Sequence, residues 1–377
     1  MPAIQAYCET NGIKFEDPDF SPNGSYPNRL AEDISPLTRI GRNAAESEQY
    51  SNLMSGGDGY DGTLEWLRCE DIPREEGQEL SVIDDLCLTD VNQGGAENCF
   101  MCAVLCGAIN KNQELLRTTV SPATPSPVGA YSVRLWVEGR WAYLPIDDRI
   151  ACKDGACWDM HSKQAHEMYV PLIAKAIAKW LLWYDLNGDD RDIGPDGVNA
   201  RTIDEGSHLY LYRALTGLDH YADLFWADKA KDKYISRKDA APLVREQFAK
   251  GVAATCGGAV ERRSGMMAKM KGNVETGLID THAYTVLWYG TIEGIEFVQL
   301  RNPWGEDGEW KGDWSDESKM WEKHPNVRDA LEALKGNSCD GRVDNSTPYS
   351  DKRGNDGIFF MTFDDFMKYW AHIEYVW

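Results

Sequence analysis

The character of the side chains changes near Gly217, and this change constrains the fold more than any other feature of the sequence. Before it, residues 99–110 are a compact helical run of small and apolar side chains, and residues 167–184 have the spacing of a long amphipathic helix. After it, residues 282–289 and 295–302 are rich in β-branched and aromatic side chains, as strands are. We therefore predict an α+β fold with a helical first half and a β-rich second half.

The chain of 377 residues is long enough for two to three domains of roughly 150 residues each. Residues 1–60 are rich in Asp, Asn, Gly, Pro and Ser, which predicts an extended N-terminal arm that lies on the body of the protein. We expect residues 61–217 to form the first domain and residues 218–377 to form the second.

The chain is strongly acidic: 39 Lys and Arg residues against 61 Asp and Glu residues give a formal net charge of −22. Such a surface repels phosphate backbones and anionic lipids, which argues against nucleic acid and membranes as partners. No stretch approaches the roughly 18 apolar residues of a membrane-spanning helix. Residues 1–11 lack the basic and apolar regions of a secretion signal, so we expect a cytoplasmic protein whose ten cysteines are reduced.

One cysteine has the surroundings of a nucleophile. Gly94 and Gly95 predict a loop, and Asn98 then precedes a helix that begins at Cys99. A thiol in the first turn of a helix lies at the positive end of the helix dipole, which favours the reactive thiolate. Acyl transfer also needs hydrogen-bond donors for the developing oxyanion. The backbone N–H of Cys99 and the side-chain amide of Gln93 are the predicted donors.

Two other interpretations of this region stay open. Cys99, Cys102 and Cys106 share one face of the predicted helix, and small buried cysteines are common in cores. This explains Cys102 and Cys106, but not Cys99, which follows the polar Asn98. The three cysteines could also bind zinc or an iron–sulfur cluster, although the sequence offers no fourth ligand.

A predicted hairpin selects His282 among the seven histidines as the partner of this thiol. If Tyr289 pairs with Ile295 across a turn at 290–294, His282 lies directly opposite Asn302. Opposed residues share a face of the sheet, with Cβ atoms about 4.5–5.5 Å apart. The Asn302 oxygen would then fix one imidazole nitrogen and leave the other to serve the thiol. A register shift of one residue would separate the two side chains.

The motifs around these residues resemble the protease core of the calpain family, within the papain-like class of cysteine proteases. The similar segments follow the family's order: 93–99 around the nucleophile, 277–284 around the histidine, and the sequence Arg-Asn-Pro-Trp-Gly at 301–305. Further agreement lies at 64–72, 146–149, 167–179, 309–316 and 356–366. The resemblance therefore extends from about residue 15 to the C-terminus.

The resemblance implies a papain-like cysteine protease of two domains, with Cys99 and Gln93 on the first and His282 and Asn302 on the second. Trp304 would shield the contact between Asn302 and His282. The implied activity is hydrolysis of internal peptide bonds of intracellular proteins, through an acyl-enzyme on Cys99.

The resemblance also implies regulation by Ca²⁺, which binds each core domain of the family and rotates the halves so that the catalytic residues meet. The matching positions of the first site are Ile83, Asp85, Asp90 and Glu167, and those of the second site are Glu309, Asp316 and Asp356. Ile358 stands where the family has a further Glu in the second site. Carbonyl and carboxylate oxygens of this kind suit Ca²⁺.

The sequence departs from the family's pattern at the nucleophile. Phe100 replaces a Trp, and Glu97 and Asn98 replace Gly and Asp, so that Glu97 places a carboxylate near the thiolate. A separate acidic stretch at 185–196 begins like an EF-hand loop. It has Asp190 at the required Gly position, which favours a solvated loop.

Two further function classes remain to be distinguished from a protease. A calpain-like pseudo-protease would keep the fold and bind proteins without cleaving them, but it would not need Gln93, Cys99, His282 and Asn302 together. A papain-like acyltransferase or deubiquitinating enzyme would use the same chemistry on other acceptors, and the flanking motifs disfavour it.

Overall fold

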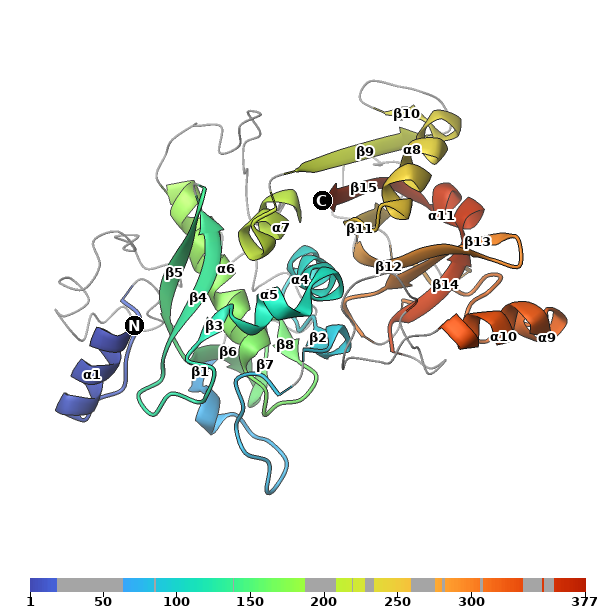
Figure 1. The fold of residues 1–377 in the computed structure, drawn as a ribbon. Helices are drawn as coiled ribbons and strands as arrows, with labels where there is room; N and C mark the ends of the chain where they lie inside the picture. Colours follow the sequence, from blue (N-terminus) through green and yellow to red (C-terminus); the bar gives the residue numbers. More distant parts are fainter. Residues whose placement is uncertain are drawn as a thin grey trace.

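The computed structural model describes residues 1–18, 64–84, 86–137, 139–186, 208–218, 220–227, 234–258, 275–279, 282–305, 308–334, 348 and 356–377. These residues form a mixed structure of helices and sheets (Figure 1). The elements before Gly217 are α1 (Pro2–Asn11), β1 (Glu65–Arg68), η2 (Cys69–Asp71), η3 (Leu88–Asp90), β2 (Val91–Asn92), α4 (Cys99–Lys111), α5 (Gln113–Arg117), β3 (Val120–Ser121), β4 (Ala130–Val137), β5 (Arg140–Asp147), β6 (Arg149–Lys153), β7 (Ala156–Cys157), β8 (His161–Ser162), α6 (Tyr169–Leu186) and α7 (His208–Thr216).

The second half is built on one large sheet. Its elements are β9 (Tyr221–Ala227), β10 (Ile235–Ser236), α8 (Arg237–Ala249), β11 (Ala253–Gly258), β12 (Ala283–Ile292), β13 (Ile295–Arg301), α9 (Met320–Lys323), α10 (Pro325–Leu334), β14 (Ile358–Thr362), α11 (Phe363–Tyr369) and β15 (Trp370–Val376). Seven strands pair in the order β10-β9-β15-β11-β12-β13-β14, and every pair except β10–β9 is antiparallel.

The first half is not simply helical, which corrects one part of the sequence prediction. Its described strands form the small sheets β1-β6-β7, β2-β8 and β3-β4-β5. Residues 131–146 alternate in the manner of strands around the turn near Gly139, and this pattern predicts the β4–β5 hairpin that the structure shows. The other sheets consist largely of strands of two to five residues, too short for alternation to reveal them. The acidic stretch at 185–196, predicted to be a solvated loop, lies outside the described residues from position 187 onward.

Helix α4 is the centre of the molecule. Every residue from Phe100 to Asn110 is buried, because small and apolar side chains occupy all faces of the helix. A helix that is apolar all round needs neighbours on every side. It packs against β11 and β12 of the large sheet, and against α5, α7, η3 and β2 of the first half (Figure 1). One continuous core therefore includes α4, α6 and α7 together with Ala283, Leu287 and Ile358 of the sheet.

Hydrogen bonds join the two halves around this helix. Asn110 Nδ2 donates to the Leu287 carbonyl at 2.9 Å, and Thr285 Oγ1 donates to the Ala103 carbonyl at 2.8 Å. At the end of α4, Lys111 Nζ donates to the Gly251 carbonyl at 2.6 Å. Because these donors are side chains that meet backbone carbonyls of the other half, they fix how α4 lies on the sheet.

The β12–β13 hairpin has a different register from the predicted one. Its turn is Glu293–Gly294, with φ of 49° and 81°, so Ile292 lies opposite Ile295 and Tyr289 lies opposite Val298. Positive φ at both turn residues is the mark of a two-residue type I′ turn, which sets this register. The prediction that Tyr289 pairs with Ile295 is therefore wrong.

A β-bulge compensates for the register that the turn sets. Between Val286 and Trp288 the pairing shifts by one residue, so that Thr285 lies opposite Arg301. Side chains alternate between the faces of a strand, and a shift of one residue exchanges the faces. Because of the bulge, positions 282 and 302 lie on the same face of the hairpin. Without it, they would lie on opposite faces.

The N-terminal segment begins with a helix, so the prediction of an extended arm at 1–60 is wrong for residues 2–11. Ile4 and Cys8, one turn apart on α1, pack with Phe15 against Val128 and Ala130. Gly12 ends the helix in the left-handed conformation, with φ of 61°. Residues 19–60 lie outside the described residues.

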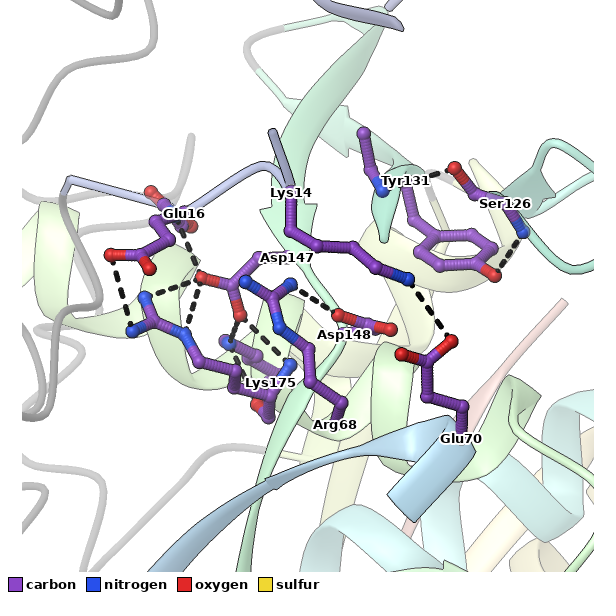
Figure 2. Close-up of polar contacts among 12 residues, drawn as sticks. Lys14, Glu16, Arg68, Glu70, Ser126, Tyr131, Asp147, Asp148 and Lys175 are labelled. Atoms are coloured by element: carbon purple, nitrogen blue, oxygen red, sulfur yellow. Dashed lines mark hydrogen bonds and ion pairs between the residues drawn. The ribbon is translucent and has the colours of Figure 1, made fainter. Parts of the chain in front are cut away.

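A buried ion pair attaches this segment to the first half, next to the polar contacts around Asp147 and Lys175 that Figure 2 shows. Lys179 on α6 donates to both carboxylate oxygens of Asp17 at 2.9 Å, and the Asp17 N–H donates to Asp147 at 2.7 Å. Asp147 also accepts from Lys175 at 2.5 Å and from Arg149 at 2.7 Å. Burial alone would raise the pKa of Asp147, but the two cations outweigh burial and lower it to about 2.

The sequence predicted that all the cysteines are reduced, and this prediction is wrong for Cys87. Eight cysteines in the described part of the chain carry free thiols, whereas Cys87 is disulfide-bonded. Among the described helices, none is both long enough and apolar enough to cross a membrane.

Removing one cation from the buried network should destabilise the protein strongly. In Lys175→Met, Asp147 loses one of its cations while it remains buried, and we expect a loss of about 3 kcal/mol in the free energy of unfolding in urea. The matched control is Lys250→Met, because Lys250 pairs with Glu246 at 2.8 Å on the exposed surface of α8. This control should cost at most about 0.5 kcal/mol. Equal effects of the two variants would contradict the argument.

Candidate active site

Cys99 is the first residue of α4, as predicted, and is partly exposed. The Asn98 carbonyl accepts the first hydrogen bonds of the helix, from Met101 N at 2.9 Å and Cys102 N at 3.2 Å. The backbone amides of Ala283 and Phe100 lie close enough to the thiol to act on its pKa, which they lower. Ala283 begins β12 and directly follows His282, so this contact brings the two halves of the site together.

The pKa of the Cys99 thiol is raised, although its position in the helix predicted the opposite. Desolvation by the surrounding protein is the largest cause, and the nearby Glu97 carboxylate adds to it, as the sequence indicated. The backbone amides of Ala283, Phe100 and Cys99 itself favour the thiolate. Desolvation outweighs these amides, so the neutral thiol is the stable form in this arrangement.

His282 forms the predicted contact with Asn302. Its Nε2 lies 2.7 Å from Asn302 Oδ1. The same oxygen accepts from the Trp304 backbone N–H at 3.1 Å. Because a backbone N–H can only donate, the amide must present its oxygen here, and the imidazole must carry its proton on Nε2. Nδ1 then has a free lone pair, and it has no hydrogen-bond partner in the structure.

The surroundings of His282 are aromatic and dry. The Trp304 ring lies 4.7 Å from the imidazole, centroid to centroid, and the Tyr284 ring meets it edge-on at 5.3 Å. The imidazole is 2% exposed. Burial lowers its pKa to about 4, against the hydrogen bond to Asn302, which raises it. The ring is therefore neutral near pH 7 and able to accept a proton.

Three glycines surround Asn302, which is fully buried. Asn302 N donates to the Gly357 carbonyl at 2.8 Å, and Gly305 N donates to the Asn302 carbonyl at 3.1 Å. A Cβ on Gly308 would lie 2.4 Å from Asn302 Nδ2, and Gly308 has φ of 64°. Only glycine accommodates both the conformation and the close approach.

Gln93 lies in the loop before α4, beside the segment that carries Asn302. Its backbone N–H donates to the Pro303 carbonyl at 2.9 Å, and its Nε2 donates to the Ala96 carbonyl at 2.7 Å. A primary amide has two N–H groups, so this bond uses one of them. The second N–H is the one that an oxyanion beside Cys99 would require.

The carboxylates predicted for the first calcium site lie around the short β2–β8 pairing. Asp90 directly precedes β2, and its carbonyl accepts from Lys163 N at 2.7 Å. Glu167 accepts from Asp84 N at 2.8 Å and from Ser162 Oγ at 2.7 Å, so it reaches the loop that contains Ile83. Asp85 lies outside the described residues.

In the second predicted site the structure brings Glu309 and Asp356 together. Glu309 accepts from Asp356 N at 3.0 Å and from Gly357 N at 2.6 Å. Asp316 follows a tight turn in which Ser315 N donates to the Gly312 carbonyl at 3.2 Å. Ile358 is completely buried in the core beside Asp356. Among the described residues, no group of three or more His, Cys, Asp or Glu side chains is arranged to hold a metal ion.

Arg301 is a site residue whose role the sequence analysis missed. It is fully buried, and it donates to Cys106 Sγ at 3.0 Å, to Asn92 Oδ1 at 3.0 Å and to the Thr89 carbonyl at 3.3 Å. It thus connects the strand before Asn302 to the segments on either side of Cys99. A charged residue inside an apolar strand was the available signal, because a buried guanidinium needs acceptors.

The sequence of the chain is similar to those of known cysteine proteases. The sequence profile of the calpain family cysteine protease matches residues 47–376. The chain belongs to the calpain family of cysteine proteases. This confirms the resemblance drawn from the motifs around Cys99, His282 and Asn302.

Curated calpains are similar to this calpain-family chain over most of its length. Calpain-8 of Mus musculus is 25% identical over 386 residues, covering 98% of this chain and 43% of the relative. Calpain-12 of Homo sapiens is 27% identical over 386 residues, covering 99% and 42%. Calpain clp-1 of Caenorhabditis elegans is 26% identical over 319 residues, covering 82% and 34%. The chain spans less than half the length of these relatives.

The protonation state of His282 should be directly measurable. An assigned imidazole resonance should titrate at about pH 4, below the ordinary range near 6.5. Asn302→Ala should lower this midpoint further, because the bond to Asn302 favours the imidazolium. Since the unfolded chain binds the proton more readily, this histidine should reduce stability as pH falls from about 6.5 to 4. A midpoint in the ordinary range would show that the ring is solvated instead.

Proposed function

We propose that this chain is a calcium-dependent cysteine endopeptidase that hydrolyses internal peptide bonds of intracellular proteins, in a papain-like arrangement of two domains. The observation that carries the proposal is the orientation of His282. Asn302 holds its Nε2 proton, while Nδ1 has no hydrogen-bond partner, and the backbone amide of the next residue, Ala283, lies near enough to the Cys99 thiol to lower its pKa. A base with a free lone pair beside a thiol at a helix N-terminus is the arrangement that nucleophilic catalysis requires.

The chemistry follows from these positions. The Cys99 thiol transfers its proton to His282 Nδ1, and the sulfur attacks the scissile carbonyl carbon. The carbonyl oxygen becomes an oxyanion, which the Cys99 N–H and the second N–H of Gln93 Nε2 would stabilise. His282 then gives its proton to the leaving amine, and the C–N bond breaks to leave a thioester. Water, deprotonated by His282, hydrolyses this acyl-enzyme and restores the thiol.

Asn302 and Trp304 assist without reacting. The Asn302 oxygen keeps the imidazole in the tautomer that accepts at Nδ1, and it stabilises the imidazolium after proton transfer. The Trp304 ring covers one side of the histidine, and its backbone N–H holds Asn302 in the required orientation. Together they explain why the Asn-Pro-Trp sequence at 302–304 accompanies the catalytic histidine.

Calcium is part of the proposal. Asp90, Glu167, the Ile83 carbonyl and Asp85 would hold one ion, and Glu309, Asp316 and Asp356 would hold a second. The donors are hard oxygens, which fits Ca²⁺. When bound, the ion would supply positive charge that draws acidic loops of one domain together. Glu167 already links two of these loops, through Asp84 and Ser162.

One observation favours the second candidate, a calpain-like pseudo-protease that binds proteins with little turnover. Burial raises the pKa of Cys99 and lowers that of His282, so both changes oppose the thiolate–imidazolium pair. Turnover therefore requires that substrate or calcium change the hydration of the pair, whereas a scaffold would not require it. We also propose a cytoplasmic location, which the eight free thiols of the described cysteines support and the disulfide at Cys87 does not.

Cys99→Ala should abolish hydrolysis of casein while leaving the thermal unfolding midpoint unchanged, because the thiol is partly exposed at a helix end. Cys8→Ala is the control for turnover, since Cys8 also carries a free thiol but lies on α1, packed near Val128 and Ala130. It should leave turnover unchanged. Full activity of Cys99→Ala would exclude Cys99 as the nucleophile, and an inactive parent protein would favour the pseudo-protease.

Glu167→Gln and Asp90→Asn should each weaken calcium binding by roughly tenfold in calorimetry and shift the calcium dependence of activity equally, because each removes one charged ligand. Glu246→Gln, on the exposed face of α8, is the control and should change neither. Unchanged calorimetric affinity in both ligand variants would remove the first calcium site from the proposal.

A further inference from the structure

A buried carboxylate lies directly behind the nucleophile. Asp159 follows β7 and is 4% exposed. Its Oδ1 accepts from the Met160 backbone N–H at 2.5 Å and from Asn98 Nδ2 in a short hydrogen bond. Burial raises the pKa of Asp159 to about 6, against the two hydrogen bonds, which lower it. The protease chemistry described above makes no use of this group.

In the described part of the chain, the Asn98 side chain forms one hydrogen bond, from Nδ2 to Asp159. It precedes the first residue of α4, where an Asn side chain commonly accepts from a backbone N–H of the first turn. Here no such bond forms, and Asn98 Oδ1 has no hydrogen-bond partner. The residue is completely buried, so its orientation depends on the bond from Nδ2 to Asp159.

The same two segments also touch along their backbones. Ala96 N donates to the Trp158 carbonyl at 3.2 Å. A Cβ on Gly94 would lie 2.3 Å from that carbonyl oxygen, and a Cβ on Gly95 would lie 2.4 Å from the Trp158 ring. The loop at 93–98, which precedes Cys99, therefore packs directly on residues 158–159. The Asn98–Asp159 hydrogen bond fixes the end of this loop that adjoins Cys99.

We propose that Asp159 is a positioning residue, which acts through Asn98 to fix the first turn of α4 and with it the Cys99 thiol and the Cys99 backbone N–H. The proposal rests on the proposed function, in that Cys99 is the nucleophile. Asp159 does not touch the substrate or the reacting atoms. Its effect is to hold the donor and the nucleophile in one fixed geometry.

The chemistry of the pair explains the unusual residue before the nucleophile. An Asp at position 98 would place two carboxylates in contact in a buried site, and like charges at that distance oppose ionisation of both. With Asn at position 98, one partner donates and the other accepts. Asn98 and Asp159 are therefore a matched pair, and an exchange of the two residues should preserve the contact.

The test compares Asp159→Asn, Asp159→Ala, Asn98→Asp and the exchange variant Asn98→Asp/Asp159→Asn. Three quantities are measured for each: kcat and KM on a peptide substrate, the rate at which iodoacetamide alkylates Cys99, read by mass spectrometry of its peptide, and the thermal midpoint. Asp148→Ala is the structural control, because Asp148 is equally buried but pairs with Arg68 elsewhere in the first half.

Asp159→Asn keeps an acceptor for Asn98 and should retain kcat within about threefold, whereas Asp159→Ala should lower kcat on the order of 10- to 100-fold with little change in KM. Asn98→Asp should lose activity similarly, and the exchange variant should recover about tenfold of that loss. Cys99 alkylation should follow the same order in all variants. Asp148→Ala should lower the thermal midpoint without changing alkylation.

An exchange variant no better than Asn98→Asp, or Asp159→Ala with unchanged alkylation of Cys99, would overturn the proposal. Alkylation separates this outcome from failure of the proposed function. If the parent protein hydrolyses no peptide, the Cys99 alkylation rates still show whether Asp159 positions the thiol.

Discussion

The enclosure of α4 is the constraint on which the structure depends. Its residues from Phe100 to Asn110 are apolar or small on every face, so the helix is stable only where protein surrounds it. The large sheet covers one side of it, and the helices and short strands of the first half cover the other. Because α4 begins at Cys99, this enclosure places the thiol where the two halves meet, beside the start of β12.

Packing alone would leave the helix free to slide along the sheet, and buried polar contacts remove that freedom. Thr285 and Asn110 each reach a carbonyl of the other half, and Arg301 contacts three acceptors around the nucleophile segment. A buried donor without an acceptor is costly, so only one relative position satisfies all of them. Arg301 directly precedes Asn302, and the same contacts therefore place the orienting amide.

Desolvation affects the proposed proton transfer from Cys99 to His282 in two opposite ways. It gives His282 a neutral ring with a free Nδ1, which a proton acceptor needs, but it also keeps Cys99 as the thiol. The amides around the sulfur and the Asn302 oxygen beside the imidazole offset part of this cost. In this arrangement the thiol and the imidazole are both neutral. The residues that fix their geometry would therefore influence the free-energy barrier to the proposed proton transfer.

The sequence by itself determined several local elements and the family to which the chain belongs. Helical spacing predicted α4 and α6, alternation predicted the β4–β5 hairpin, and the motifs selected Cys99, His282 and Asn302, because such patterns are written in neighbouring residues. Only the tertiary structure decided the bulge that sets the face of His282, the helix at residues 2–11, the net direction of the Cys99 pKa, and the pairing of Asn98 with Asp159. These depend on desolvation and on contacts between residues far apart in the chain, for which local periodicity carries no signal.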